Sequence, residues 1–306
     1  MTSPSNIIIG DAGYINLVPN TTTAQVYTIT AAPFDWQDAG VTLTHGPTDT
    51  SHLFSTESCS GNTCTVTFNT NVTGAGNSIA ALDFSDSTIQ LTVSGSNLSS
   101  TPPSWKVAPV VGQFMQGGVV FWVGDANNPS APGYRQALVA AVSDISTTKT
   151  WGPTGTSVSD AQHQGLFTDP SGAATGLTNT NAICAVDAGS GTTCKSSGTS
   201  YPAAQAAQSY ISGGKTDWFL PAIGHPGELD TMYGVKAIIN ATATATGHGG
   251  SDFGTCFGSN NCFYWSSSEY VLNTINAWYV YFNGGDQSGN GKDDQVSVRP
   301  VRAFNY

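Results

Sequence analysis

Two glutamates are the residues that could perform acid–base chemistry in this chain. Glu269 lies in the aromatic stretch YWSSSEY, and Glu228 begins a segment with helical spacing. Glycoside hydrolysis requires a pair of carboxyl groups at a defined separation. Alternatively, these carboxyls and the arginines of the C-terminal stretch neutralise each other in the interior, because an unpaired buried charge is very costly. The residues alone leave both interpretations open.

The cysteines offer a second kind of chemistry. They fall into local pairs separated by short Gly-, Asn-, Ser- and Thr-rich segments, namely Cys59 with Cys64, Cys184 with Cys194, and Cys256 with Cys262. No CxxC or Cys/His spacing supports a zinc site. The pattern favours disulfides between the local partners, although sequence cannot choose among the possible connectivities. Disulfides indicate an oxidising compartment.

Oxygen ligands for Ca²⁺ are present in one polar loop, at Asp286, Asn290, Asp293 and Asp294. Carboxylate and amide oxygens are the ligands that this hard cation prefers. A loop of Gly, Asn and Asp is also a common solvated loop, so we expect no metal or cofactor and keep Ca²⁺ as the alternative.

Composition narrows the class of protein. Only 9% of residues are charged, while 39% are hydrophobic and Gly is abundant, which favours an extracellular β-rich protein. The net charge of −11 argues against nucleic acid as a partner, and no Lys/Arg cluster exists to bind anionic lipid. No apolar run is long enough to span a membrane. We expect a removed N-terminal export signal or anchor and a location outside the cell or on its outer surface.

The N-terminal part reads as an all-β unit. Short β-branched runs are separated by Pro, Gly, Asn and Asp at the intervals typical of sandwiches, at residues 6–10, 24–31, 41–44, 64–70, 79–84 and 89–94. This pattern predicts an immunoglobulin-like β-sandwich that serves as a stalk over residues 1–104. Prolines in residues 97–109 predict a linker, with the second domain spanning residues 105–306.

The C-terminal part mixes strands and helices. Apolar runs predict strands at residues 110–123, 137–142, 263–270, 277–282 and 296–304, and helical spacing predicts helices at residues 203–211 and 226–240. Residues 150–180 read as a long ordered loop. Alternation places Trp278, Val280 and Phe282 on the buried face of their strand, so that Tyr279 and Tyr281 point outward.

Several motifs in this part occur in a specific order: GGVVFWV, LVAA, DWFLP, GELDTMY, YWSSSEY, AWYVYF and VRPVRAF. Together, over residues 110–304, they resemble the C-terminal domain of the Legionella collagen-like adhesin (Lcl) family. The resemblance implies an α+β fold related to C-type lectins and similar to the formylglycine-generating enzymes. No collagen-like Gly-X-Y tract is present, and the first domain takes its place.

A narrower resemblance concerns the C-terminal motifs. YWSSSE, AW and VRPVRAF look like the fixed positions of C-type-lectin-fold variable proteins that are diversified by retroelements, and residues 270–295 are rich in the residue types that such diversification produces. The resemblance implies a structural role for the framework residues, which are Trp265, Glu269, Trp278, Arg299, Arg302 and Glu228.

The expected ligand-binding surface lies between these motifs. Tyrosine supplies large, rigid contact area at low entropy cost, and small polar neighbours adapt their hydrogen bonds around it. The predicted contact residues are Tyr270, Leu272, Asn273, Ile275, Tyr279, Tyr281, Asn283, Asp286, Ser288, Asn290, Asp293 and Asp294. We expect them to form one contiguous exposed surface.

These observations predict an exported cell-surface binding protein, an adhesin or receptor rather than an enzyme. Its partner is expected to be a protein or glycan on another cell or host surface. Proteins resembling Lcl bind sulfated glycans, but this chain is acidic and Lys292 is the chief basic residue near the expected surface, which favours a protein or neutral glycan. The alternative is a carbohydrate-active or formylglycine-generating-type enzyme on the same fold.

Overall fold

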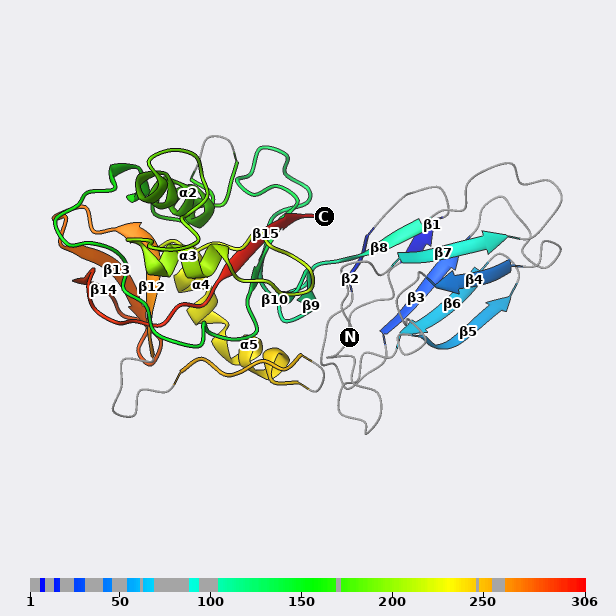
Figure 1. Ribbon diagram of the computed structural model, residues 1–306. Coiled ribbons are helices and arrows are strands. Elements are labelled where there is room, and N and C mark those ends of the chain that lie inside the picture. The colour runs from blue at the N-terminus through cyan, green and yellow to red at the C-terminus, as the bar shows by residue number, and fades with distance from the viewer. Residues whose placement is uncertain are drawn as a thin grey trace. The chain divides into compact units, whose positions relative to one another are not determined.

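The computed structural model of the chain describes residues 109–168, 172–245, 248–254 and 262–306, together with the backbone of strands between residues 6 and 108 (Figure 1). The chain divides into two compact units, residues 1–114 and 115–306. Within the described residues, no helix has the length and hydrophobicity needed to cross a membrane.

The first unit consists of short strands in two sheets. The strands are β1 (Asn6–Ile8), β2 (Tyr14–Asn16), β3 (Gln25–Thr30), β4 (Val41–His45), β5 (Phe54–Ser60), β6 (Thr63–Phe68), β7 (Thr88–Val93) and β8 (Ser104–Ala108). One sheet has the order β1-β3-β6-β5 and the other the order β2-β8-β7-β4. Most pairs are antiparallel, and β1–β3 and β2–β8 are parallel. The all-β character of this part thus agrees with the sequence pattern, and the strand expected at residues 79–84 lies outside the described residues.

The prediction of a linker at residues 97–109 is wrong for the second half of that range. Residues 104–108 form β8, which pairs with both β2 and β7. Pro102 and Pro103 directly precede these residues in the sequence, and proline is tolerated ahead of a strand because it is excluded only from a strand's hydrogen-bonded interior. The prolines therefore mark the start of a strand.

The second unit contains two sheets and several helices (Figure 1). One sheet has the order β15-β11-β10-β9, and is formed by β9 (Phe114–Met115), β10 (Gly118–Val123), β11 (Gln136–Ala140) and β15 (Val301–Asn305). The other has the order β12-β13-β14, and is formed by β12 (Phe263–Glu269), β13 (Asn276–Tyr281) and β14 (Gln287–Gly291). The helices are η4 (Ser159–Ala161), α2 (Thr175–Ala188), α3 (Pro202–Gln208), α4 (Glu228–Gly234) and α5 (Lys236–Ala243).

The C-terminal residues 296–305 join the two sheets. Lys149 N donates to Val296 O and Trp265 N donates to Ser297 O, while β15 pairs with β11 farther along. Val296, Val298 and Val301 are fully buried. The apolar residues of this stretch are therefore buried as expected, while the strand expected at residues 296–304 is confirmed only at Val301–Asn305.

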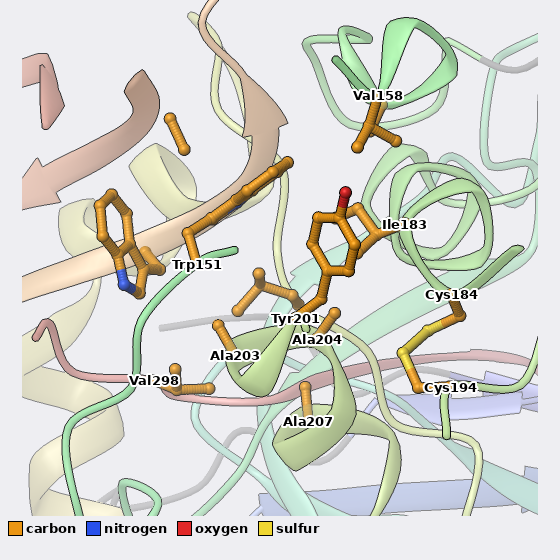
Figure 2. Packing of buried hydrophobic residues seen from close by; sticks show 14 of the residues in the cluster. Trp151, Val158, Ile183, Cys184, Cys194, Tyr201, Ala203, Ala204, Ala207 and Val298 are labelled. Atoms are coloured by element: carbon orange, nitrogen blue, oxygen red, sulfur yellow. A yellow bond between two sulfur atoms is a disulfide. The ribbon is translucent and has the colours of Figure 1, made fainter. Parts of the chain in front are cut away.

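Three large aromatic residues, Trp151, Tyr201 and Trp265, pack in the core beside β12, in the cluster that Figure 2 shows. Trp151 and Tyr201 meet edge to face at 5.8 Å between ring centres. Trp265 is buried in the same cluster, and its indole N–H donates to Lys149 O at 2.8 Å. Each large ring thus fills the core, and the indole nitrogen has the acceptor that a buried polar group needs.

Helix α2 was not expected, because residues 150–180 read as a loop. Its sequence, TGLTNTNAICAVDA, contains Gly, Asn and several Thr, which are poor helix formers. Tertiary contacts supply the missing stability: Thr180 Oγ1 accepts from Leu220 N at 3.1 Å, and Cys184 is cross-linked to Cys194. Packing overrides propensity here.

The helix expected at residues 226–240 is interrupted. It forms α4 and α5, which meet at Gly234 and Val235. Glycine is costly inside a helix because it loses the most backbone freedom on folding, and this position is where the helical path breaks.

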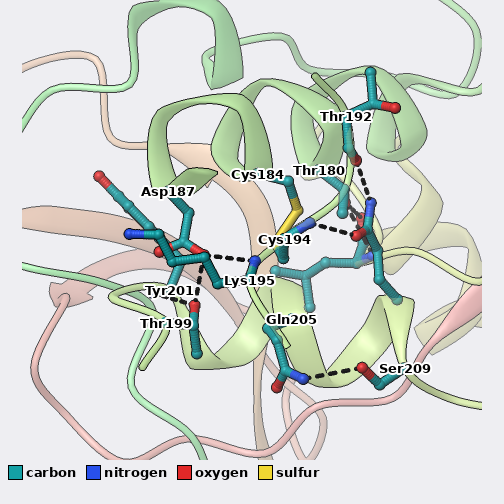
Figure 3. Close-up of a disulfide and its surroundings, with 12 residues drawn as sticks. Thr180, Cys184, Asp187, Thr192, Cys194, Lys195, Thr199, Tyr201, Gln205 and Ser209 are labelled. Carbon is teal, nitrogen blue, oxygen red and sulfur yellow. Dashed lines mark hydrogen bonds between the residues drawn. A yellow bond between two sulfur atoms is a disulfide. The ribbon is translucent and has the colours of Figure 1, made fainter. Parts of the chain in front are cut away.

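The disulfide between Cys184 and Cys194 is confirmed, with a Cα–Cα distance of 4.2 Å (Figure 3). Cys262 is also disulfide-bonded, while its expected partner Cys256 lies outside the described residues. Cys59 and Cys64 stand opposite each other in the register of β5 and β6, and the structure describes only their backbone.

Candidate ligand-binding site

The turn between β12 and β13 presents apolar side chains to solvent. Val271, Leu272 and Ile275 are 57%, 77% and 55% exposed. Asn273 holds the turn, because its Oδ1 accepts hydrogen bonds from Ile275 N and Asn276 N at 3.0 and 2.9 Å. Val271 was not among the predicted contact residues, although its place beside Leu272 in a polar stretch was an available signal. We call residues 271–275 the hairpin tip.

Neighbouring segments frame the hairpin tip. Lys292 N donates to Ile275 O at 2.9 Å, and Gly155 N donates to Thr274 O at 3.0 Å. Asp293 and Asp294 are exposed and directly follow Lys292 in the chain. The first contact therefore brings them near the hairpin tip. The tip is therefore an apolar surface with acidic residues beside it.

Tyr279 and Tyr281 lie on one face of β13 and are only half-buried. Both contact Phe263 on β12, edge to face at 5.2 Å for Tyr279 and stacked at 4.9 Å for Tyr281. Tyr279 also packs against the core cluster. Each ring therefore exposes part of its surface and packs against other rings with the rest. The sequence predicted that both side chains would simply point outward.

Tyr270 lies elsewhere. Its ring contacts Trp278 at 4.6 Å, and alternation along β13 places Trp278 on the face opposite Tyr279. Gly289 stands across from Trp278, and a Cβ there would come within 3.1 Å of the Tyr270 ring. The single contiguous surface that we expected is therefore divided between two faces of the sheet.

Trp278 differs from the buried framework residue that we expected. Val280 and Phe282, on the same alternating positions, are buried, whereas Trp278 is half-buried. Its indole N–H has no hydrogen-bond partner among the described residues. Phe282 contacts Tyr233 of α4 edge to face at 5.5 Å, whereas the ring that Trp278 contacts is that of Tyr270.

The other predicted contact residues are distributed along β14 and its turns. Asn283, Asp286 and Ser288 are exposed, and Asn290 is half-buried. Asn283 Nδ2 donates to Tyr281 Oη at 3.2 Å, which connects the turn to the tyrosine face. Asp286 precedes β14 and Asp293 follows it, so the suggested Ca²⁺ ligands are spread over the length of a strand. Within the described residues, no group of His, Cys, Asp or Glu side chains is arranged to hold a metal ion.

Glu269 is a fully buried carboxylate at the end of β12. Its Oε1 lies 2.5 Å from Lys292 Nζ, and the lysine side chain is equally buried. Further donors to this carboxylate are Ser157 Oγ, Val158 N and Gln162 Nε2 at 3.2, 3.0 and 3.0 Å. Burial alone would raise the pKa of Glu269, but the hydrogen bonds from Lys292, Gln162 and Val158 hold that pKa below its ordinary value. The ionised carboxylate is thus fully engaged inside the domain.

Lys292 is buried, contrary to the expectation that it lies near the exposed surface. Its Nζ also donates to Thr156 O at 2.7 Å and lies 4.8 Å from the centre of the Trp151 ring. The positive charge is neutralised by Glu269 and shielded from solvent. Lys292 therefore adds nothing to the attraction of an anionic ligand.

Glu228 is fully buried, and no cation pairs with it within the described part of the chain. Its Oε1 accepts from Gly176 N at 2.9 Å and its Oε2 accepts from Ala222 N at 2.8 Å. Burial raises the pKa of Glu228 to about 8, and the backbone hydrogen bonds oppose this rise only in part. A Cβ at position 176 would lie 2.2 Å from Oε2, so only glycine permits this approach.

The expected pairing of Glu228 and Glu269 with the arginines is wrong. Arg299 Nε donates to Asp144 Oδ1 at 2.5 Å, and Arg302 Nε donates to Asp217 Oδ1. The C-terminal strand runs beside residues 141–149 and 219, which brings these aspartates closest to the arginines. The arginines stabilise the strand contacts, and the glutamates find lysine and backbone donors instead.

Removal of Lys292 should destabilise the second unit strongly. Lys292→Met leaves the Glu269 carboxylate buried without its cation, and we expect the free energy of unfolding to fall by about 3–5 kcal/mol. Chemical denaturation of the full chain measures the change. The control, Lys195→Met, removes an exposed charge and should change the free energy by less than about 0.5 kcal/mol. Equal effects of the two substitutions would refute the role of the buried pair.

The protonation of Glu228 should make stability depend on pH. Because its folded pKa is raised, its stabilising contribution is fully present below the ordinary value of 4.5 and is lost as the pH rises through about 8. Over that range, we expect the free energy of unfolding of wild type to fall relative to that of Glu228→Gln. A ¹³C titration of the carboxyl should give a midpoint near 8; a midpoint near 4.5 contradicts the assignment.

Comparison with known proteins places the chain in a family. No curated protein matches it. A solved structure, that of the Yersinia pseudotuberculosis adhesin InvE, aligns over 96% of this chain and 96% of its own at 14% identity, with a TM-score of 0.18 that carries no structural argument. The family model of the Lcl C-terminal domain matches residues 140–302, which is more than half of the chain. The match includes α2 to α5, the sheet β12-β13-β14 and both arginines, and the chain belongs to the Lcl C-terminal domain family.

Proposed function

We propose that this chain is a surface-exposed binding protein of the adhesin type, and that the hairpin tip is its principal contact with a ligand. The observation that carries the proposal is the exposure of Val271, Leu272 and Ile275 in a turn that Asn273 fixes. An apolar patch with a polar rim is typical of an interaction site, since solubility alone disfavours it.

The hydrogen bonds that fix the turn strengthen this interpretation. The backbone carbonyls of residues 274 and 275 accept hydrogen bonds from the N–H groups of Gly155 and Lys292. The apolar side chains are therefore held in place before a ligand arrives. A preformed surface loses less conformational entropy on binding than a flexible loop does. The half-buried tyrosines of β13 supply further contact area beside β14.

The charges around the hairpin tip favour a protein or a neutral glycan as the ligand. Asp293 and Asp294 are exposed, whereas Lys292 between the tip and these residues is neutralised in the interior. A sulfated glycan would meet acidic groups here and find no free cation from Lys292. We further propose that the chain is exported to the cell surface, which its disulfide, its composition and its family favour.

We also propose fold assignments for the two units. The paired four-stranded sheets of the first support an immunoglobulin-like stalk. The antiparallel sheets and flanking helices of the second support the C-type-lectin-related fold that the family resemblance implies.

The glutamates favour a binding role over hydrolysis. Both carboxyls are fully buried, Glu269 against Lys292 and Glu228 against backbone N–H groups. A general acid or base must reach the proton that it transfers. Neither carboxyl is presented to solvent for that purpose.

Replacing the apolar side chains of the hairpin tip should abolish binding. The full chain carrying Leu272→Ser and Ile275→Ser is compared with wild type on immobilised matrix proteins, neutral glycans and heparin. We expect wild type to bind a protein or neutral glycan, the double variant to lose that binding, and both to melt at the same temperature. Ile211→Ser, which removes an equally exposed apolar side chain elsewhere, is the control and should bind normally.

Two results would contradict this proposal. One is unchanged binding by the double variant. The other is salt-sensitive binding to heparin that exceeds binding to every protein and neutral glycan, because the acidic surroundings of the tip oppose a polyanion.

We further propose that a retroelement diversifies this surface. The exposed side chains of residues 271–294 lie in turns and at one edge strand, where substitution leaves the core intact. Gene sequences from sibling isolates should therefore differ mainly at the predicted contact positions, with Trp265, Glu269 and Arg299 unchanged. Substitutions spread evenly over the core and the hairpin tip would exclude diversification.

A further inference from the structure

Strand β14 has one open edge. It is the last strand in the order β12-β13-β14, and within the described residues no further strand pairs with it. Tyr281 N donates to Asp286 O at 2.8 Å in the register of β13 with β14, so Asp286 directs its backbone groups toward β13. Antiparallel strands alternate between hydrogen-bonded and non-hydrogen-bonded positions. Gln287 and Gly289 therefore direct their backbone N–H and C=O groups away from β13, where these groups meet no partner within the described residues.

The open edge lacks the usual protections against pairing with another chain. Natural edge strands carry proline, lysine or a β-bulge that prevents such pairing. Residues 287–291 contain neither proline nor lysine, and they pair with β13 without a shift of register. Gly289 and Gly291 also have no side chain that would obstruct an approaching backbone. The edge can therefore accept a further strand, and its length of five residues means that side-chain contacts must add to the affinity.

The charges along β14 are acidic. Asp286 precedes the strand, Asp293 and Asp294 follow it, and all three are exposed. Lys292, at the end of the strand, is neutralised by Glu269 in the interior. A second copy of this chain would bring like charges together at the edge, whereas a basic segment complements them.

The other lysine near this part of the sheet lies on the opposite face. Lys236 Nζ is 4.5 Å from the centre of the Tyr233 ring, and that ring contacts Phe282. Phe282 and Tyr281 are neighbours in an extended segment and project to opposite faces. Because Asp286 stands across from Tyr281, its carboxylate is on the face that Lys236 does not reach.

The tyrosines of β13 provide contacts for a cationic side chain. Tyr279 stands opposite Ser288, as Tyr281 does opposite Asp286, and residues opposite each other in a sheet project to the same face. Ser288 is small and exposed, so a long side chain on an added strand can cross it to the half-buried ring of Tyr279. A lysine or arginine in this position meets the Asp286 carboxylate and aromatic rings, which attract cations.

We propose that β14 binds an extended, basic peptide segment of a protein ligand, which joins the sheet as a further strand. The outward backbone groups of Gln287 and Gly289 form hydrogen bonds with this segment, and its basic side chains lie over Ser288. In β-strand addition the main chain supplies affinity, and alternate side chains supply specificity. This inference rests on the proposed function, because it names the class of ligand for the surface next to the hairpin tip.

Amide NMR of the full chain tests the proposal with three matched peptides. The cationic probe is an end-capped heptapeptide of alternating lysine and threonine. One control replaces lysine by glutamate, and the other is N-methylated at the threonines, which would face Gln287 and Gly289. We expect the cationic probe to slow hydrogen exchange at Gln287 and Gly289 but not at Ser288 or Asn290, whose N–H groups already face β13. Both controls should bind at least roughly tenfold more weakly.

Two substitutions at one position separate pairing from packing. Gly289→Pro and Gly289→Ala both add a Cβ about 3.1 Å from the Tyr270 ring, but only proline removes the outward N–H. We expect Gly289→Ala to bind the cationic probe as wild type does, and Gly289→Pro to bind it at least roughly tenfold more weakly. The N-methylated probe removes the same hydrogen bonds from the ligand side, so the test does not depend on how the proline variant folds. Asp286→Asn should also weaken binding, whereas Asp125→Asn, at an exposed position in another turn, should not.

Three results would overturn the inference. The first is equal binding of the cationic probe and either control peptide. The second is unchanged hydrogen exchange at Gln287 and Gly289 when the cationic probe is added. The third is protection of both amides without any peptide at high protein concentration, which would indicate pairing between copies of this chain.

The double variant of the hairpin tip, with Leu272→Ser and Ile275→Ser, separates this inference from the proposed function. It should still bind the cationic probe at β14 while it loses the immobilised ligand. Loss of the immobilised ligand, with no binding of the probe by wild type, contradicts this inference alone. Unchanged binding of the immobilised ligand contradicts the proposed role of the hairpin tip, whatever the probe does at β14.

Discussion

The buried carboxylate of Glu269 is the constraint on which the second unit depends. It joins the end of β12 to Lys292 after β14, and through Ser157, Val158 and Gln162 it also fixes the segment that leads into η4. A charge in the interior is tolerated only when donors surround it, so these segments must arrive together. The hairpin tip is built on elements that this one group holds, because Lys292 N donates to Ile275 O.

Sequence reasoning succeeded where the pattern is local. The alternation of Val296 and Val298 predicted their burial, although the expected strand itself forms only at Val301–Asn305, and the short spacing of Cys184 and Cys194 predicted their disulfide. It failed where distant segments decide the outcome. Lys292 is preceded by Gly and followed by Asp, and nothing in that stretch reveals that Glu269 will bury it.

The candidate sites show the same limit. The hairpin tip was recognisable, since apolar residues in a polar stretch indicate a surface turn, but the packing of Tyr270 against Trp278, on the face opposite Tyr279, becomes apparent only in the folded hairpin. Helix α2 could not be predicted, because the low helix propensity of its Gly, Asn and Thr residues conceals it.

The place of the C-terminal strand has a consequence for how the protein is made. Arg299 reaches Asp144 across a separation of 155 residues, and β11 has β15 as its partner on one side. A ribosome releases the chain from its N-terminus, so β11 and the core beside it remain without this partner until residues 301–305 have left the ribosome. Long-range pairing of this kind is slow and leaves apolar surface open to aggregation. The nascent second unit is therefore a natural client for chaperones, whereas the first unit can complete both of its sheets while translation continues.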